Sequence, residues 1–127
     1  MIKLILKYSL IISILWTLII LILCCTPGKY IPNTTWLEVL NFDKLVHSSL
    51  FFVLIVLWLM YINYYKNLNK LRTILTLVLC VFYGGILEIL QANVFSQRSG
   101  DWFDFIANTL GCLIGLCFFS RKMKSLI

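Results

Sequence analysis

The sequence predicts an all-α fold: an integral membrane bundle of four transmembrane helices, forming one domain over residues 1–127 with both termini cytoplasmic. Three observations lead to this expectation: the composition, the lengths of the apolar runs and the distribution of basic residues. Hydrophobic residues make up 61% of the chain and charged residues 13%, whereas soluble domains have about 45–50% and about 25%. A domain this small exposes too much surface to cover it with so few charges, so integration into a membrane is expected.

Four apolar runs are candidates for membrane-spanning helices, which need about 20 mostly apolar residues. They do not alternate with period two, so strands are not expected. The runs cover residues 5–24, 45–62, 73–90 and 103–120. The last three are near the short end of the usual range, so little tilt is expected.

The first run, which follows Lys3 and Lys7, also has features of a secretory signal peptide. Its apolar stretch is longer than a signal core of about 7–15 residues, and no small-residue cleavage site follows it. We therefore expect a retained helix. The chain has five cysteines in or beside apolar runs, without metal-ligand spacing, and these are expected to be packing residues. They are Cys24, Cys25, Cys80, Cys112 and Cys117.

The basic residues gather on one side of the predicted topology. Eight of the eleven lie in the amino-terminal segment, the loop between the second and third helices and the tail, and these parts contain no acid. Because basic loops stay in the cytoplasm, the loops over residues 25–44 and 91–102 are expected outside. This rule explains the net charge of +6 without nucleic acid as a partner, and no nucleic-acid motif is present.

Polar residues interrupt the second and third helices near the predicted outer side. Asp43 and His47 are four apart and share a helix face, although Asp43 also suits a helix N-cap. Glu88 is expected one or two turns below the outer surface, with Gln91 on nearly the same face. An ionisable residue at this depth is costly unless it faces protein or water. We expect Glu88 to face the bundle; the alternative is a carboxyl group that reaches the headgroups or carries a proton.

The stretch RSGDWFDFIANTLG, residues 98–111, places polar residues at helical spacing where the fourth helix begins. Asp101 is a candidate N-cap with Asp104 at N3, as in a capping box with Asp in place of Glu. A cap does not explain Asn108, which lies a turn deeper and forms one polar stripe with the two acids. Arg98 is the expected cationic partner of these acids, since it is the one basic residue of that loop.

Small residues mark the surfaces at which helices are expected to pack closely. They recur every four residues in the fourth helix, at Ala107, Gly111 and Gly115, and two are adjacent in the third helix, at Gly84 and Gly85. The glycines of the third helix are expected to let another backbone approach. Asn108 adjoins the small stripe of the fourth helix, so its amide is expected to point into the bundle.

Topology brings these polar side chains, from three helices, to the outer half of the membrane. They predict a polar pocket open to the extracytoplasmic side. The candidate substrate-binding residues are Asp43, Lys44, His47, Glu88, Gln91, Arg98, Asp101, Asp104 and Asn108. The candidate catalytic residues, for acid–base chemistry, are His47, Glu88, Asp101 and Asp104. Clustered carboxylates can bind a divalent cation, but no metal ligands are assigned, and cofactors and oligomeric state stay open.

Three pieces of the sequence, in this order, resemble the VanZ-like family of small bacterial membrane proteins. They are DKLVH (43–47), EILQ (88–91) and R-x-x-D-x-x-D-x-x-x-N-x-x-G (98–111), and the resemblance covers about residues 25–118. The family often has a tyrosine one turn after the histidine, where this chain has Phe51, which puts a role for that hydroxyl in doubt. The family is named for glycopeptide resistance, chiefly to teicoplanin. The resemblance implies a multi-pass protein of the bacterial cytoplasmic (inner) membrane, but supplies no biochemical activity.

Three functions are compatible with these features of the sequence. The first is binding or processing of a lipid-linked or cell-envelope component at the bilayer, with Arg98 and Lys44 holding phosphate and His47 shuttling a proton. The second is a non-catalytic module whose polar residues lock the helices together and support a partner. The third is a small proton- or ion-coupled transporter, disfavoured because four short helices show no internal repeat. Enzymatic activity is left open, since no hydrolase signature such as G-x-S-x-G or H-E-x-x-H is present.

Overall fold

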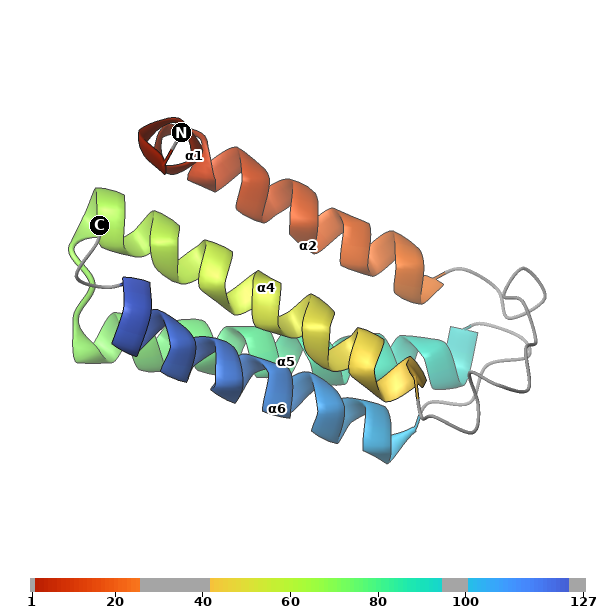
Figure 1. The fold of residues 1–127 in the computed structure, drawn as a ribbon. Helices are drawn as coiled ribbons and strands as arrows, with labels where there is room; N and C mark the ends of the chain where they lie inside the picture. The colour runs from red at the N-terminus through yellow and green to blue at the C-terminus, as the bar shows by residue number, and fades with distance from the viewer. Residues whose placement is uncertain (1, 26–41, 95–100, 124–127) are drawn as a thin grey trace.

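The structure, a computed structural model, describes residues 2–25, 42–94 and 101–123. In this part of the chain every regular element is a helix (Figure 1), which confirms the all-α prediction. The elements are α1 (Ile2–Lys7), α2 (Ser9–Cys25), α4 (Phe42–Lys66), α5 (Lys70–Val94), α6 (Trp102–Phe118) and the π-helix η2 (Phe119–Met123).

Within the described residues, three helical segments are long and apolar enough to cross a membrane. They are Asp43–Lys66, Lys70–Asn93 and Trp102–Met123. The remaining predicted span, the first run over residues 5–24, corresponds mainly to α2, which is apolar but has only 17 residues. At 1.5 Å per residue it is about 26 Å long, somewhat less than the hydrocarbon thickness of about 30 Å.

The first apolar run is not one straight helix, because it is divided at Tyr8 into α1 and α2. In Figure 1, α1 is seen nearly end-on, whereas α2 runs across the view. The Ser9 hydroxyl donates to the Leu6 carbonyl oxygen at 2.7 Å, and serine side chains that bond back to the preceding turn often bend helices. α2 itself packs against α4 and α5, with Trp16 Nε1 donating to the Leu50 carbonyl oxygen at 3.0 Å.

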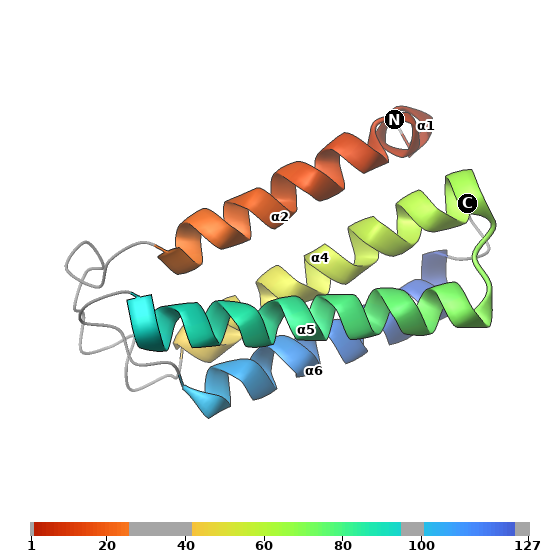
Figure 2. The same ribbon diagram turned by 180° about the vertical axis from the view of Figure 1, so that it is seen from behind.

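The helix α4 is central to the bundle and packs against α2, α5 and α6, most closely against α6. The two views in Figures 1 and 2 show that α4 and α6 run parallel, while α5 runs antiparallel to both. The inward face of α4 supplies much of the core, through Phe51, Leu54, Ile55 and Leu59, each at most 1% exposed. The bundle therefore places the first turns of α4 and α6 and the last turns of α5 at one end, called here the polar end.

Glycines of α6 allow its backbone to lie directly against the backbone of α4. A Cβ atom on Gly111 would collide with the carbonyl group of Ser48, and one on Gly115 would lie 2.9 Å from the carbonyl oxygen of Phe52. The small stripe of the fourth helix thus packs tightly, as predicted. The third helix was expected to let another backbone approach at Gly84 and Gly85, and this was wrong. The atoms that would lie nearest a Cβ atom at these two positions belong to side chains.

A three-residue connection joins α4 to α5 and reverses the chain. Asn67 has a φ of 55°, in the left-handed region that asparagine tolerates better than most residues. The Asn69 side chain accepts a hydrogen bond from the Arg72 backbone N–H at 2.8 Å and so caps α5. This short turn is the reason that α4 and α5 are antiparallel neighbours.

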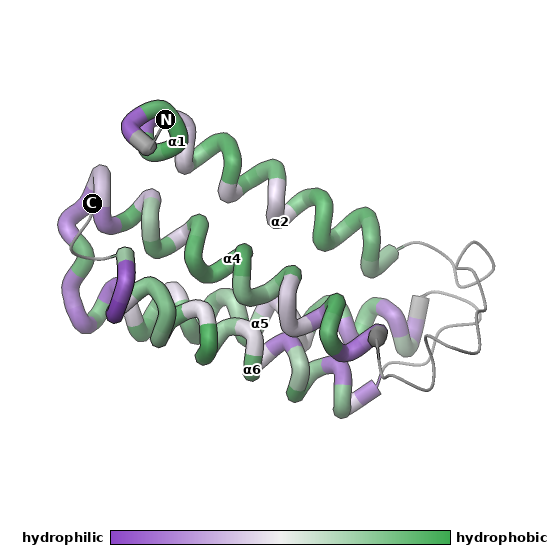
Figure 3. Tube along the Cα trace, in the orientation of Figure 1, coloured by the Kyte–Doolittle hydropathy of each residue, from purple (hydrophilic) through white to green (hydrophobic). Residues whose placement is uncertain are grey.

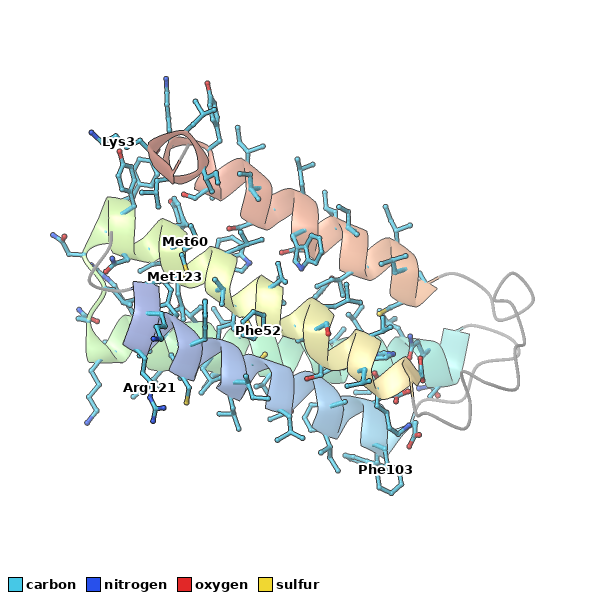
Figure 4. The ribbon with its side chains drawn as sticks, in the orientation of Figure 1. Lys3, Phe52, Met60, Phe103, Arg121 and Met123 are labelled. Carbon is cyan, nitrogen blue, oxygen red and sulfur yellow. The ribbon has the colours of Figure 1, made fainter. Side chains whose placement is uncertain are left out.

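The surface of the bundle is apolar along its length and charged at its ends. Many large hydrophobic side chains of α2, α5 and α6 are exposed, for example Ile22, Leu79 and Ile114, each more than half exposed. Figure 3 shows the hydrophilic residues concentrated near the helix ends. In Figure 4, Lys3 and Arg121 lie at one end of the bundle and Phe103 at the other. An exposed apolar surface of this extent is expected of a chain that faces lipid.

The contact between α4 and α6 leads to a prediction about two glycines. Gly111→Ala should destabilise the bundle by about 1–3 kcal/mol, because its methyl group would push against the Ser48 backbone, which cannot move aside. The matched control is Gly85→Ala, where a Cβ atom would meet only the Phe105 ring at 3.4 Å. Thermal unfolding of the purified protein in detergent measures both; equal melting temperatures for the two variants would contradict this account of the α4–α6 contact.

Candidate functional site

The two acids at the start of α6 have different partners: Asp101 caps its own helix, and Asp104 pairs with Lys44 of α4. Asp101 is the N-cap of α6, and its Oδ1 accepts the Phe103 N–H at 2.9 Å, as predicted. The rest of the predicted capping box is not formed. The Asp101 backbone N–H donates instead to Glu88 Oε2 on α5, at 3.4 Å, while Asp104 faces Lys44. Glu88 therefore faces the bundle, as expected from the sequence, and contacts the amino-terminal end of α6.

Lys44 joins the first turn of α4 to the first turn of α6. Its Nζ lies 3.2 Å from Asp101 Oδ2 and 3.2 Å from Asp104 Oδ1. The Asp104 side chain is 10% exposed, and that of Asp101 39%. The hydrogen bond from the Phe103 N–H, followed by the Lys44 ammonium, lowers the pKa of Asp101 below its ordinary value. Among the described residues, Lys44 is the cation that lies against these acids; the prediction for Arg98 falls outside the described residues.

A buried chain of side chains runs from α5 through α6 to α4. Asn108 Nδ2 donates to Glu88 Oε1 at 3.3 Å, and Asn108 Oδ1 lies 3.1 Å from His47 Nδ1. The same His47 nitrogen is 3.9 Å from Glu88 Oε1. On the other side of the ring, His47 Nε2 lies 3.7 Å from Asp43 Oδ1. The Asn108 amide thus points into the bundle, as predicted, and holds Glu88 and His47 together.

Seven of the nine predicted site residues form one polar cluster at the polar end. These are Asp43, Lys44, His47, Glu88, Asp101, Asp104 and Asn108. Gln91 does not join this polar cluster, since its Nε2 donates to the Cys24 carbonyl oxygen at 3.1 Å and ties α5 to α2. Every buried side-chain nitrogen or oxygen in the described residues has a hydrogen-bond partner.

A second polar group lies deeper in the bundle, and its members were not among the predicted site residues. Trp58 Nε1 donates to Thr17 Oγ1 at 3.3 Å, and the Tyr83 hydroxyl donates to the Thr17 carbonyl oxygen at 2.7 Å. These three residues line a mainly apolar cavity of about 340 Å³ between α2, α4 and α5. In the sequence, the feature that could have identified these residues is a hydroxyl or indole side chain within an apolar run. Phe51, at the position where the family often has tyrosine, is fully buried and packs on the Tyr83 ring, with centroids 6.1 Å apart.

The chemistry open to the polar cluster follows from its connected acids and base. Four carboxyl groups, one imidazole and one ammonium are linked across three helices, and His47, Glu88 and Asp104 are buried. A carboxylate that holds an imidazole through an amide can orient that ring. The ammonium of Lys44, which is 33% exposed, together with the more open Asp101 and Asp43, could contact a ligand that reaches the polar end.

Comparison with known proteins gives one family match and one relative. The family model described as VanZ/LLP1 matches residues 9–123 of this chain. An uncharacterized protein of Schizosaccharomyces pombe is 28% identical over 88 residues, which are 66% of this chain. The match spans only about half of the relative, 52% of its length. No solved structure matches the chain significantly.

The ion pair across α4 and α6 leads to a double-mutant prediction. Lys44→Met and Asp104→Asn should each destabilise the bundle, and the double variant should be less destabilised than the sum. A coupling free energy of about 1 kcal/mol is expected, because the pair is only partly exposed to solvent, Lys44 by 33% and Asp104 by 10%. Thermal unfolding in detergent at two salt concentrations measures it. Strict additivity of the two single effects would show that the two side chains do not interact.

Proposed function

We propose that this chain, which belongs to the VanZ/LLP1 family, is a multi-pass membrane protein that binds a lipid headgroup, or a lipid-linked envelope component, at its polar cluster. One observation carries the proposal: His47, Glu88, Asp104 and Asn108 are buried and connected at one end of a bundle whose sides are apolar. Ionisable residues in a membrane-spanning segment are costly and usually mark a functional site.

Helix packing by itself does not require this much charge. Buried ion pairs stabilise a fold weakly, and apolar residues of similar volume often replace them without loss. The bundle already has a close glycine contact between α4 and α6 and an apolar core along α4. A set of four carboxyl groups around one histidine and one lysine therefore favours a ligand over a purely structural role.

The accessible part of the polar cluster suits a headgroup with both a phosphate and hydroxyl or amino groups. The Lys44 ammonium can attract phosphate, while carboxylates such as Asp101 and Asp43, 39% and 64% exposed, accept hydrogen bonds from hydroxyl or amino groups. The relative in a yeast favours a ligand that eukaryotic membranes also contain. A change in envelope lipids is also the route by which such a protein would affect teicoplanin-type resistance.

The proposed orientation places both termini in the cytoplasm and the polar cluster on the extracytoplasmic side of a bacterial inner membrane. The support is the charge distribution, because Lys3 and Arg121 lie at the end of the bundle opposite Phe103, and basic ends stay inside. In this arrangement α2 is the fourth span, its shorter length made up by α1 and by local thinning of the bilayer.

A second candidate function is a non-catalytic module whose polar cluster fixes the helix arrangement for a partner. The observation in its favour is that no buried side-chain nitrogen or oxygen of the described residues lacks a hydrogen-bond partner. A fully satisfied network can specify helix packing without any ligand. The two functions differ in what happens when one member of the polar cluster is changed conservatively.

Glu88→Gln separates the two candidates. Glutamine keeps the size of glutamate, but its amide cannot accept hydrogen bonds from both Asp101 and Asn108, so headgroup binding should fall at least tenfold while most of the protein stays folded. Lipids that co-purify with the protein, identified and quantified by mass spectrometry, measure the binding. The control is Asn93→Ala, at the same end of α5, where the side chain is exposed and bonds only to its own helix.

The outcomes of this experiment are distinct. Specific lipid enrichment that Asn93→Ala keeps and Glu88→Gln loses supports the proposed function. Loss of folded Glu88→Gln protein in parallel with its bound lipid favours the structural module. Wild-type protein with no enrichment of any lipid over the surrounding membrane would sink the headgroup proposal.

The orientation has its own test by cysteine labelling. In a background without native cysteines, an impermeant thiol reagent should label Arg98→Cys in intact cells, because this loop is expected outside. Lys66→Cys, at the end of α4, should be labelled only after the membrane is made permeable. The reverse pattern would place the polar cluster on the cytoplasmic side.

A further inference from the structure

We propose that Asp43, His47 and Asp104 bind a divalent transition-metal ion at the polar end. One ligand atom from each of these three residues lies within 4.8 Å of the other two. Two zinc bonds of about 2.1 Å place the ligand atoms at most about 4.2 Å apart, so a small side-chain movement closes the site. The inference deepens the proposed function, because it places an ion inside the polar cluster to which we assign a headgroup.

The hydrogen bonds of Asn108 determine which His47 nitrogen is available. Asn108 uses its amide nitrogen to donate to Glu88 Oε1 at 3.3 Å, so its oxygen is the atom that faces His47 Nδ1, at 3.1 Å. An oxygen there requires Nδ1 to carry the proton. In the neutral ring the other nitrogen, Nε2, then presents a lone pair, which is the form of histidine that binds metals.

His47 Nε2 is not one of the fully enclosed atoms, all of which have partners, and no donor of the described residues forms a hydrogen bond with it. The His47 side chain is 8% exposed, and Asp43 Oδ1 lies 3.7 Å from Nε2. A carboxylate and an imidazole lone pair are both acceptors, and an acceptor cannot satisfy another acceptor. A cation between them satisfies both, and Asp104 completes a set of three ligands.

The helices hold these ligands in place before any ion arrives. Asp43 and His47 are one turn apart on α4 and so share a face, and Asp104 lies in the first turn of α6. The contact between Gly111 and the Ser48 backbone fixes the spacing of α4 and α6 close to the ligands, because Ser48 directly follows His47 and Gly111 lies about two turns after Asp104. Glu88 and Asn108 complete the arrangement by orienting the imidazole, as groups around metal-bound histidines commonly do.

The ligand set indicates the kind of ion. One imidazole nitrogen with two carboxylates suits Zn²⁺ or Mn²⁺, whereas Ca²⁺ and Mg²⁺ prefer oxygen ligands alone. The described part of the polar end contains four carboxyl groups and one lysine. A divalent cation would therefore offset excess negative charge. Three protein ligands leave a position open, to which a headgroup phosphate could bind.

The test measures metal binding directly, on full-length protein in lipid nanodiscs after treatment with a chelator. Calorimetric titration with Zn²⁺, and electron paramagnetic resonance with Mn²⁺, should show one site per chain. His47→Gln and Asp104→Asn should weaken that binding at least tenfold. Asn108→Leu should weaken it by about 10–100-fold, because the imidazole loses its orientation. The control is Asn93→Ala, at the same end of α5, whose exposed side chain bonds only to its own helix; it should keep binding within about threefold.

Circular dichroism identifies any variant that fails to fold. In that case His47→Ala is used instead, and added imidazole should restore its metal binding. Binding that is equal in wild type and His47→Gln, or no binding of either ion, overturns the metal site. Its failure is distinct from failure of the headgroup proposal: lipid enrichment without metal binding rejects only the ion, and metal binding without lipid enrichment rejects only the headgroup.

Discussion

The close approach of α4 and α6 is the constraint on which the polar cluster depends. Gly111 and Gly115 let two parallel backbones touch at Ser48 and Phe52. Because the helices are parallel, their first turns lie side by side, and Lys44 can reach both acids of α6. The antiparallel α5 then adds Glu88 from the opposite direction. A looser contact would separate the two first turns and leave buried charges without partners, which is costly in a membrane.

Much of this arrangement could be predicted because helical periodicity and membrane composition act locally. Apolar run length gave the helices, and residue spacing correctly placed Asp101 as a cap and Asn108 toward the interior. Spacing does not say which neighbour lies opposite a given face. That is why Gln91, on nearly the same face as Glu88, was assigned to the site although it bonds to Cys24 on α2. For the same reason, the acceptor of the Asp101 backbone N–H was expected to be Asp104 of the same helix, whereas it is Glu88 of α5.

The first helix shows a second limit of sequence reasoning. An apolar run gives a length, but the Ser9 hydroxyl and the division at Tyr8 shorten the regular helix in a way that composition does not record. The group formed by Thr17, Trp58 and Tyr83 depends on three helices meeting, and each of these residues alone is common in membrane helices. Polar contacts between transmembrane helices are individually modest, about 0.6 kcal/mol on average. They become evident only once the helices are assembled.

The direction of each helix also determines how the peptide groups act on the acids. A helix carries about half a positive charge at its start and half a negative charge at its end. Asp43, Asp101 and Asp104 lie at the starts of α4 and α6, where the aligned peptide dipoles favour a negative side chain. Glu88 lies six residues before the end of α5 at Val94, outside the last turn in which the dipoles act. Its carboxylate instead accepts hydrogen bonds from an N–H at the start of α6 and from the Asn108 amide, so a neighbouring helix stabilises a charge that its own helix does not.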